Sequence, residues 1–113
     1  MTRDRKIDYI EFNATNIEAA KKFYGEVFGW KFTDYGPDYT SFEDGRIAGG
    51  FSKGTVSPAG TLIVIYVDDL KDAEQRVRNA GGRITKETFS FPGGSRFHFA
   101  DPNGNVLAVW HNE

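Results

Sequence analysis

The chain of 113 residues has the length of one domain, and its 14 basic and 16 acidic residues are mixed along it, for a net charge of −2. The scattered basic residues argue against a nucleic-acid surface, and the absence of cysteine excludes disulfides and thiolate chemistry. The longest apolar run, Leu62–Val67, is far shorter than a membrane helix of ~20 residues, and no apolar region of a secretion signal follows MTRDRK, so we expect a cytoplasmic protein without membrane contact.

The first half of the chain predicts one strand, one helix and three further strands. Alternation predicts a strand at Ile7–Asn13, and Thr15 or Asn16 can cap the helix that ends at Gly29. The apolar stripe of this helix comprises Ile17, Ala20, Phe23, Tyr24, Val27 and Phe28. The further strands are expected at 30–35, 39–43 and 46–53, with a hairpin turn at Asp44-Gly45. Gly49 and Gly50 inside the last strand indicate a bulge or a close backbone approach.

The second half repeats this order after a linker at residues 54–60. A strand is predicted at Thr61–Val67, followed by a helix that Asp68 or Asp69 caps and that Gly81-Gly82 ends. The apolar stripe of this helix is Leu70, Ala73, Val77 and Ala80. Three strands follow at 83–89, 95–100 and 105–111, separated by a loop at 92–94 and a tight turn at 101–104.

The two halves align at an offset of 53 residues, which indicates an internal repeat. This offset places Ile17 on Leu70, Tyr24 on Val77 and Gly29 on Gly82. The sequence therefore predicts two strand–helix–strand–strand–strand modules, at residues 6–53 and 61–111. A helix should cover one face of each small sheet and leave the other face to line a cavity.

The order of elements, the helix end FYGEVFGW and the late segment FADPNGNVLAVW together resemble the vicinal oxygen chelate superfamily. This superfamily includes glyoxalase I, bleomycin resistance proteins and extradiol dioxygenases. The resemblance implies one α+β domain over residues 1–113, in which two βαβββ modules form a cupped, open, barrel-like sheet. It also implies a homodimer, because small members of the superfamily often build their pockets between chains.

The resemblance further implies where a metal would be bound. In the metal enzymes of the superfamily, His and Glu side chains on four inward strands hold a divalent cation. Those positions fall here on Tyr9, Gly49 or Gly50, Leu62 and Ala108. Because all but Tyr9 lack a ligating side chain, we expect no metal at the usual place and no other cofactor. A displaced metal site using Glu11 and His98 is the alternative.

Strand alternation predicts which side chains line the cup. Tyr9 and Glu11 should face inward from the first module, and Tyr66 and Trp110 from the second. If the turn at 101–104 closes a hairpin with Phe99 opposite Leu107, His98 lies beside Ala108 and also faces inward. The candidate ligand-binding residues are Tyr9, Glu11, Tyr66, Arg96, His98 and Trp110. His111, near the end of the chain, is expected to be exposed.

Each candidate also has a purely structural interpretation. Glu11 could be a solvated carboxylate or pair with an arginine, and Arg96 could pair with Glu11 or hold an anionic ligand. His98 could be a hydrogen-bonded strand histidine or a general base, since its ordinary pKa of ~6.5 allows either. The aromatic residues could belong to the core or to a dimer interface.

The mixed aromatic and polar lining predicts metal-independent binding of a small, partly aromatic or apolar molecule, in a sequestration or carrier role. The alternative is a lyase or dioxygenase-type enzyme of the same superfamily with a displaced or metal-free site. His98 and Glu11 would then be its catalytic acid–base pair. A third interpretation is a cup that grips a partner protein. The sequence leaves open the ligand and whether the modules pair within one chain or between two.

Overall fold

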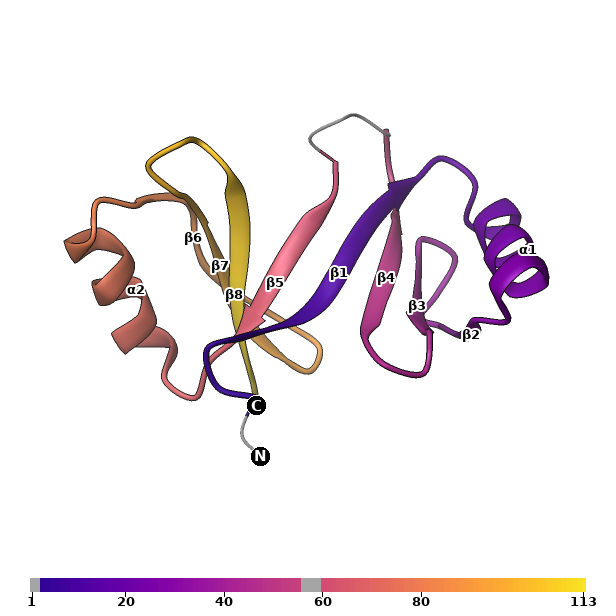
Figure 1. The fold of residues 1–113 in the computed structure, drawn as a ribbon, viewed down its shortest axis with the longest axis horizontal. Helices are drawn as coiled ribbons and strands as arrows, with labels where there is room; N and C mark the ends of the chain where they lie inside the picture. The colour runs from indigo at the N-terminus through magenta and orange to yellow at the C-terminus, as the bar shows by residue number, and fades with distance from the viewer. Residues whose placement is uncertain (1–2, 56–59) are drawn as a thin grey trace. The chain divides into compact units, whose positions relative to one another are not determined.

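The computed structural model describes residues 3–55 and 60–113, and the chain divides into two compact units. Tyr9–Leu62 forms the N-terminal unit, whereas Ile63–Glu113 joins the segment up to Asp8 to form the C-terminal unit. Each unit combines one helix with a four-stranded sheet (Figure 1). Of the predicted linker at 54–60, residues 56–59 lie outside the described residues. Within the described part of the chain, neither helix is long and apolar enough to cross a membrane.

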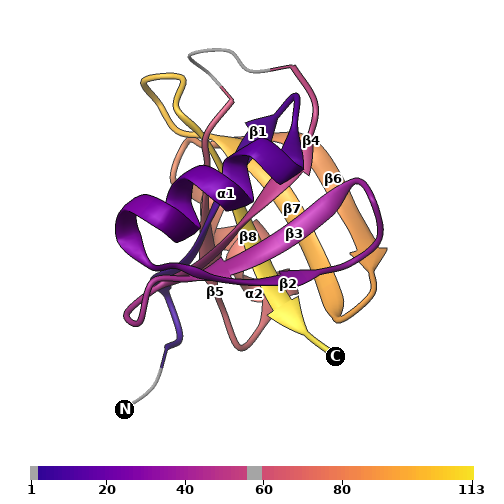
Figure 2. The ribbon, with the colours of Figure 1, turned by 90° about the vertical axis from the view of Figure 1, so that its right-hand side faces the viewer.

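The sheet of the N-terminal unit has the strand order β2-β3-β4-β1. Strand β1 runs parallel to β4, whereas the β2–β3 and β3–β4 pairs are antiparallel. Its elements are β1 (Lys6–Ala14), α1 (Ile17–Phe28), β2 (Lys31–Asp34), β3 (Tyr39–Glu43) and β4 (Ala48–Lys53). Helix α1 lies across one face of this sheet (Figure 2). The strand–helix–strand–strand–strand order predicted for this module is confirmed.

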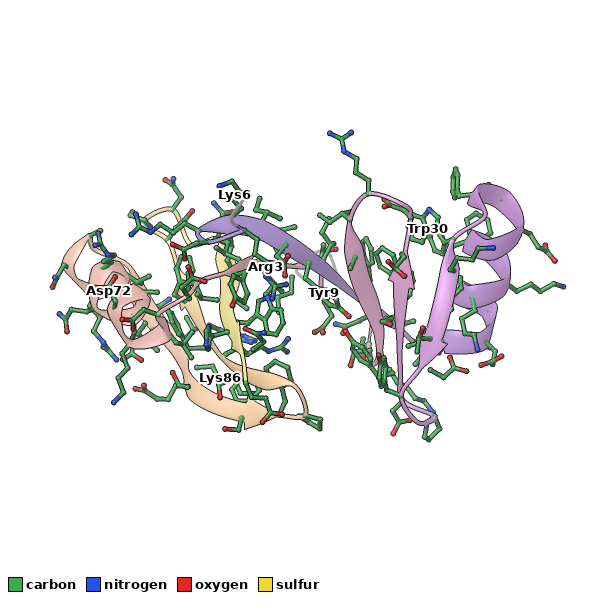
Figure 3. The ribbon with its side chains drawn as sticks, turned by 90° about the horizontal axis from the view of Figure 1, so that it is seen from below. Arg3, Lys6, Tyr9, Trp30, Asp72 and Lys86 are labelled. Carbon is green, nitrogen blue, oxygen red and sulfur yellow. The ribbon has the colours of Figure 1, made fainter. Side chains whose placement is uncertain are left out.

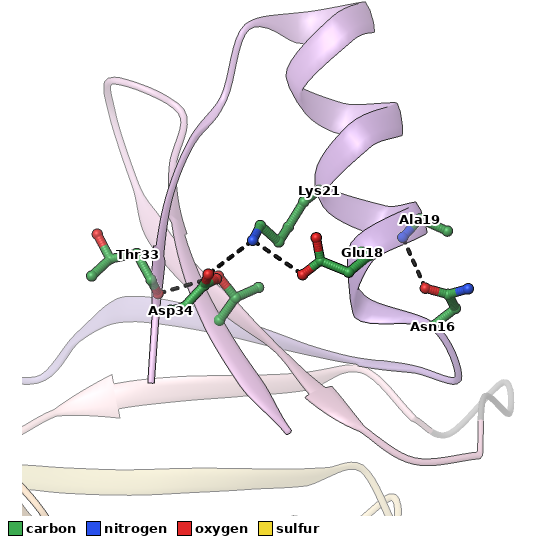
Figure 4. A network of polar contacts seen from close by, with 7 residues as sticks. Asn16, Glu18, Ala19, Lys21, Thr33 and Asp34 are labelled. Carbon is green, nitrogen blue, oxygen red and sulfur yellow. Dashed lines mark hydrogen bonds and ion pairs between the residues drawn. The ribbon is translucent and has the colours of Figure 1, made fainter. Parts of the chain in front are cut away.

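The ends of helix α1 follow from its flanking residues. Asn16 is the N-cap, and its Oδ1 accepts a hydrogen bond of 2.9 Å from the backbone N–H of Ala19. Gly29 ends the helix in the left-handed conformation, with φ at 73°. Lys21 then ties the helix to the sheet, since its Nζ contacts Glu18 at 3.2 Å and Asp34 of β2 at 2.9 Å (Figure 4).

The predicted apolar stripe of α1 is only partly correct. Residues packed between helix and sheet include Ile17, Ala20, Tyr24, Trp30, Phe42 and Phe51. In contrast, the side chains of Phe23, Val27 and Phe28 are 54%, 56% and 62% exposed. These three residues are absent from the cluster packed against the sheet, and Phe28 is the last residue of α1.

The C-terminal unit repeats the same topology with the strand order β5-β8-β7-β6. Strand β5 runs parallel to β8, and the β7–β8 and β6–β7 pairs are antiparallel. Its elements are β5 (Leu62–Tyr66), α2 (Leu70–Asn79), β6 (Arg83–Phe91), β7 (Gly94–Ala100) and β8 (Val106–Asn112). Asp69 caps α2 through a 3.0 Å bond from the N–H of Asp72. The predicted repeat, and with it the α+β class, is confirmed, while the cup formed by the two modules stays a prediction.

The core of the C-terminal unit lies between α2 and its sheet. Its apolar side chains include Ile65, Val67, Leu70, Ala73, Val77, Phe97, Phe99 and Val109. The predicted hairpin register is confirmed, since Phe99 pairs with Leu107 and His98 with Ala108. Two expectations were wrong. Ala80 is an exposed cap beyond the end of the helix, and the predicted loop at 92–94 is shorter because β7 begins at Gly94.

Candidate functional site

The six predicted binding residues belong to two different units. Tyr9 and Glu11 lie in the N-terminal unit, on the sheet face opposite α1. Tyr66, Arg96, His98 and Trp110 lie in the C-terminal unit. The open face of each sheet is therefore a separate candidate site.

The open face of the N-terminal unit carries a chain of three hydrogen-bonded side chains. The Tyr39 hydroxyl donates to Glu11 Oε2 at 3.0 Å, so it accepts the 2.6 Å bond that links it to the Tyr9 hydroxyl. Tyr9 points away from α1, whereas Trp30 lies on the helix side (Figure 3). Burial, followed by the negative charge of Glu11, raises the pKa of Tyr39 well above its usual value. Tyr39 therefore stays a neutral hydrogen-bond donor.

Gly50 makes room for this hydrogen-bonded chain. A Cβ atom at Gly50 would lie 2.1 Å from Tyr39 Oη and 2.7 Å from Tyr9 Oη. At the neighbouring Gly49, a Cβ would lie 2.2 Å from the Ile10 carbonyl oxygen. The sequence offered a bulge or a close approach for this pair, and the structure shows the close approach. Tyr39 was not among the predicted site residues, although Gly50, a glycine inside a strand, indicated that a large side chain could lie over that position.

The open face of the C-terminal unit is aromatic. The rings of Tyr66 and Trp110 meet edge to face at 5.4 Å and 76°, and the Phe91 ring lies 6.2 Å from Trp110. Tyr66 and Trp110 are direct partners across the β5–β8 pair. We name the aromatic face by its residues, Tyr66, Phe89, Phe91, Arg96, His98 and Trp110.

Cations lie over the rings of the aromatic face. The guanidinium carbon of Arg96 is 5.5 Å from the Phe89 ring and 5.7 Å from the Phe91 ring. Lys86 Nζ lies 4.5 Å from the Phe89 ring, and the ring of His98 packs 5.8 Å from the same phenylalanine. Arg96 and His98 were predicted to face this side of the sheet, and these contacts place them there. Lys86 and Phe89 were not among the predicted residues.

His111 was predicted to be exposed, and this expectation was wrong. The ring is half-buried, packs 5.7 Å from Tyr66, and its Nδ1 lies 2.9 Å from the carbonyl oxygen of Val67. The carbonyl can only accept, so Nδ1 carries the proton. Strand β8 runs to Asn112, and its pairing with β7, in which His111 lies opposite Ser95, holds the histidine against the protein.

The positions onto which the resemblance places the superfamily's metal ligands offer few ligating atoms in this chain. Gly50 and Ala108 have no ligating atoms, and a longer side chain at Gly50 would collide with Tyr39. Tyr9, the one position with a ligating atom, bonds to the Tyr39 hydroxyl. Among residues 3–55 and 60–113, no three His, Asp or Glu side chains come together as a metal-ligand group.

The duplicated βαβββ architecture defines a class of protein in which two such modules share one chain. Comparison with protein families then identifies it: the model of the Glyoxalase/Bleomycin resistance protein/Dioxygenase superfamily matches residues 6–109. The chain belongs to this superfamily, which confirms the resemblance seen in the sequence. A glyoxylase-like domain-containing protein from Didymella fabae is 30% identical over 121 residues, covering 92% of this chain and 91% of that protein.

Solved structures share the fold at low sequence identity. A superfamily member from Vibrio splendidus 12B01 aligns with a TM-score of 0.73 and 17% identity, covering 92% of this chain and 97% of that one. The Mn(II)-bound glyoxalase from Novosphingobium aromaticivorans aligns with a TM-score of 0.71 and 19% identity, covering 98% of this chain but 40% of that one. At such identities the likeness concerns the fold alone.

Proposed function

We propose that the protein binds a small, partly aromatic or apolar molecule on the aromatic face of its C-terminal unit, without a metal ion, in a sequestration or carrier role. The observation that carries this proposal is the cluster of rings on a face that no helix covers. The Trp110 ring contacts both of its neighbours, with ring centres 5.4 Å from Tyr66 and 6.2 Å from Phe91. Flat apolar walls with a few polar groups are typical of small-molecule sites.

The polar groups of the face support an oriented ligand. Arg96 and His98 lie among the rings and can orient a ligand by hydrogen bonding or charge. The metal-independent part of the proposal rests on the mismatch at Gly50 and Ala108 described above. The superfamily's metal-polarised chemistry would need ligands that these positions do not supply.

Trp110 itself can report binding. The chain has 2 tryptophans, so a ¹⁵N–¹H NMR spectrum contains two indole N–H signals, which Trp30→Phe assigns. We expect titration with the neutral aromatic probe 2-naphthol, in the presence of EDTA, to shift the Trp110 signal and raise the melting temperature. Phe91→Ala should weaken this binding about tenfold, because a ring of the site is removed.

Phe28→Ala is the matched control, since it removes an exposed ring of α1 in the other unit. It should leave the affinity for 2-naphthol unchanged. If 2-naphthol and related flat molecules do not change the chemical shift of the Trp110 indole N–H at millimolar concentration, the proposed function is wrong. If binding requires an added divalent metal, its metal-independent part is wrong.

A further inference from the structure

The Tyr66–Trp110 pair is already occupied by a side chain of the same unit. The guanidinium carbon of Arg3 lies 3.9 Å from the centre of the Tyr66 ring and 5.5 Å from that of Trp110. Because the two rings meet at 76°, they form two walls around the cation. Ring faces attract cations through their quadrupole, most strongly for indole.

A carboxylate completes the surroundings of this cation. Asp8 Oδ2 accepts a 3.0 Å hydrogen bond from Trp110 Nε1 and lies 3.7 Å from Arg3 Nη1. The Asp8 side chain is only 21% exposed, so its charge acts close to the rings and is partly shielded from water. Tyr66, Trp110 and Asp8 therefore form what we name the cation cage.

The walls of the cage are held by contacts that do not involve Arg3. Tyr66 is 6% exposed, and its hydroxyl donates a 2.6 Å hydrogen bond to Asn112 Oδ1. The bond from Trp110 to Asp8 fixes the indole in the same way. The cage should therefore keep its shape when Arg3 leaves it.

The segment that carries Arg3 is anchored beside the cage. The backbone N–H of Arg5 bonds to the Tyr66 carbonyl at 2.7 Å, and Asp4 Oδ1 accepts from the N–H of Asp68 at 2.9 Å. Arg5 has a φ of 63°, the only non-glycine residue with a positive φ in the described part of the chain. The anchoring fixes the backbone, whereas the Arg3 side chain is still 49% exposed and can swing away.

We propose that the cation cage is a binding site for organic cations and that Arg3 is its internal occupant, which a ligand displaces. The ligand class is a molecule with a quaternary ammonium or guanidinium group on an apolar body. This inference rests on the proposed function, because Tyr66 and Trp110 of the cage belong to the aromatic face, and it specifies the charge of the ligand.

Choline and 3,3-dimethylbutan-1-ol are suitable probes, because they have nearly the same shape and differ in charge. With the Trp110 indole N–H signal as readout, we expect choline to bind Arg3→Ala at least tenfold more tightly than the unaltered protein. The neutral alcohol should bind Arg3→Ala at least tenfold more weakly than choline does. Lys6→Ala removes one charge from the same exposed segment without touching the cage, so it should behave as the unaltered protein.

Asp8→Asn in the Arg3→Ala background tests the carboxylate, since asparagine keeps an acceptor for the Trp110 N–H but loses the charge. It should remove most of the preference for choline over the alcohol. Equal binding of the two probes to Arg3→Ala would overturn the cation cage, and equal choline affinity with and without Arg3 would overturn the displacement. Either result leaves the proposed function standing if 2-naphthol still binds, whereas loss of all three probes removes both proposals.

Discussion

Gly50→Ala tests the account of the N-terminal unit most directly. The added Cβ would lie 2.1 Å from Tyr39 Oη and 2.5 Å from Tyr39 Cζ, where ordinary contacts are longer than about 3.4 Å. The Tyr39 ring must therefore move by about 1 Å or more. Such a movement breaks the 2.6 Å bond to Tyr9 or the 3.0 Å bond to Glu11.

The expected cost is a loss of about 2–3 kcal/mol in the free energy of unfolding. Overpacking a well-filled position costs about 1–3 kcal/mol, and a lost hydrogen bond about 1 kcal/mol, more when one partner is charged. Water can replace part of the lost bonding because Tyr39 is half-buried, so the two contributions do not add in full. Urea unfolding should show a lower midpoint with an unchanged slope.

Two further variants make this prediction refutable. Gly54→Ala is the matched control, because the nearest atom to its Cβ is Asn13 Oδ1 at 3.7 Å, and its stability should change by less than about 0.5 kcal/mol. Tyr39→Val removes the ring that Gly50→Ala would strike. The double variant Gly50→Ala/Tyr39→Val should therefore lose about 1–2 kcal/mol less in free energy of unfolding than the two single variants lose together. Strict additivity, or a Gly50→Ala protein as stable as Gly54→Ala, would refute the close-approach explanation.

Three other predictions concern caps, helix propensity and pH. Gly25→Ala should raise stability by about 0.5–1 kcal/mol in urea, because Gly25 lies inside α1 and its Cβ would have no neighbour closer than 3.8 Å; a loss would contradict this. Asn16→Ala should lower the free energy of unfolding by about 1 kcal/mol, because it removes the side-chain acceptor of the Ala19 N–H. An unchanged stability would mean that water replaces this hydrogen bond fully. A hydrogen bond from the Asn105 side chain, followed by bonds from backbone N–H groups, lowers the pKa of the Asp101 carboxyl below its ordinary 3.8. The stability that ionised Asp101 contributes is therefore fully present above pH 3.8, and it disappears as the pH falls through the lower pKa of the folded state. Asp101→Asn, which keeps an acceptor, should therefore flatten the acid limb of stability against pH, and an unchanged limb would assign that limb to other carboxylates.

The sequence predicted those features of the fold that depend on local patterns. Strand alternation and the caps of both helices are set within about ten positions of the chain, and the offset of 53 residues repeats such local patterns; the element order that they predict was confirmed. The errors arose where contacts with segments far away in the chain decide whether a side chain is exposed. Phe23 and Phe28 fit the helical stripe, but the sequence does not state how far the sheet extends beneath it. His111 was expected to be exposed because it is near the chain end, but its ring packs against Tyr66 and its Nδ1 bonds to the Val67 carbonyl, contacts that local patterns do not show.

The candidate site was less predictable for the same physical reason. Tyr39 contacts Tyr9 across 30 positions, and Arg3 lies over Tyr66 across more than twice that separation. Side-chain contacts of this kind depend on strand register and on rotamers, which alternation alone does not fix. Arg3 had no pattern around it at all, since it precedes the first strand. Gly50, in contrast, did mark the position of Tyr39.

The repeated topology also explains why we assign ligand binding to the C-terminal unit. Both sheets pair their first and last strands in parallel, so positions in one unit have direct equivalents in the other. Asn13 and Ser52 are partners in the N-terminal unit, where the C-terminal unit has Tyr66 and Trp110. The same backbone geometry thus presents an amide and a hydroxyl in one unit and two aromatic rings in the other. Exchanging Trp110 for serine would give the C-terminal unit the polar partner of its counterpart, and we expect that variant to fold but to lose both the 2-naphthol and the choline sites.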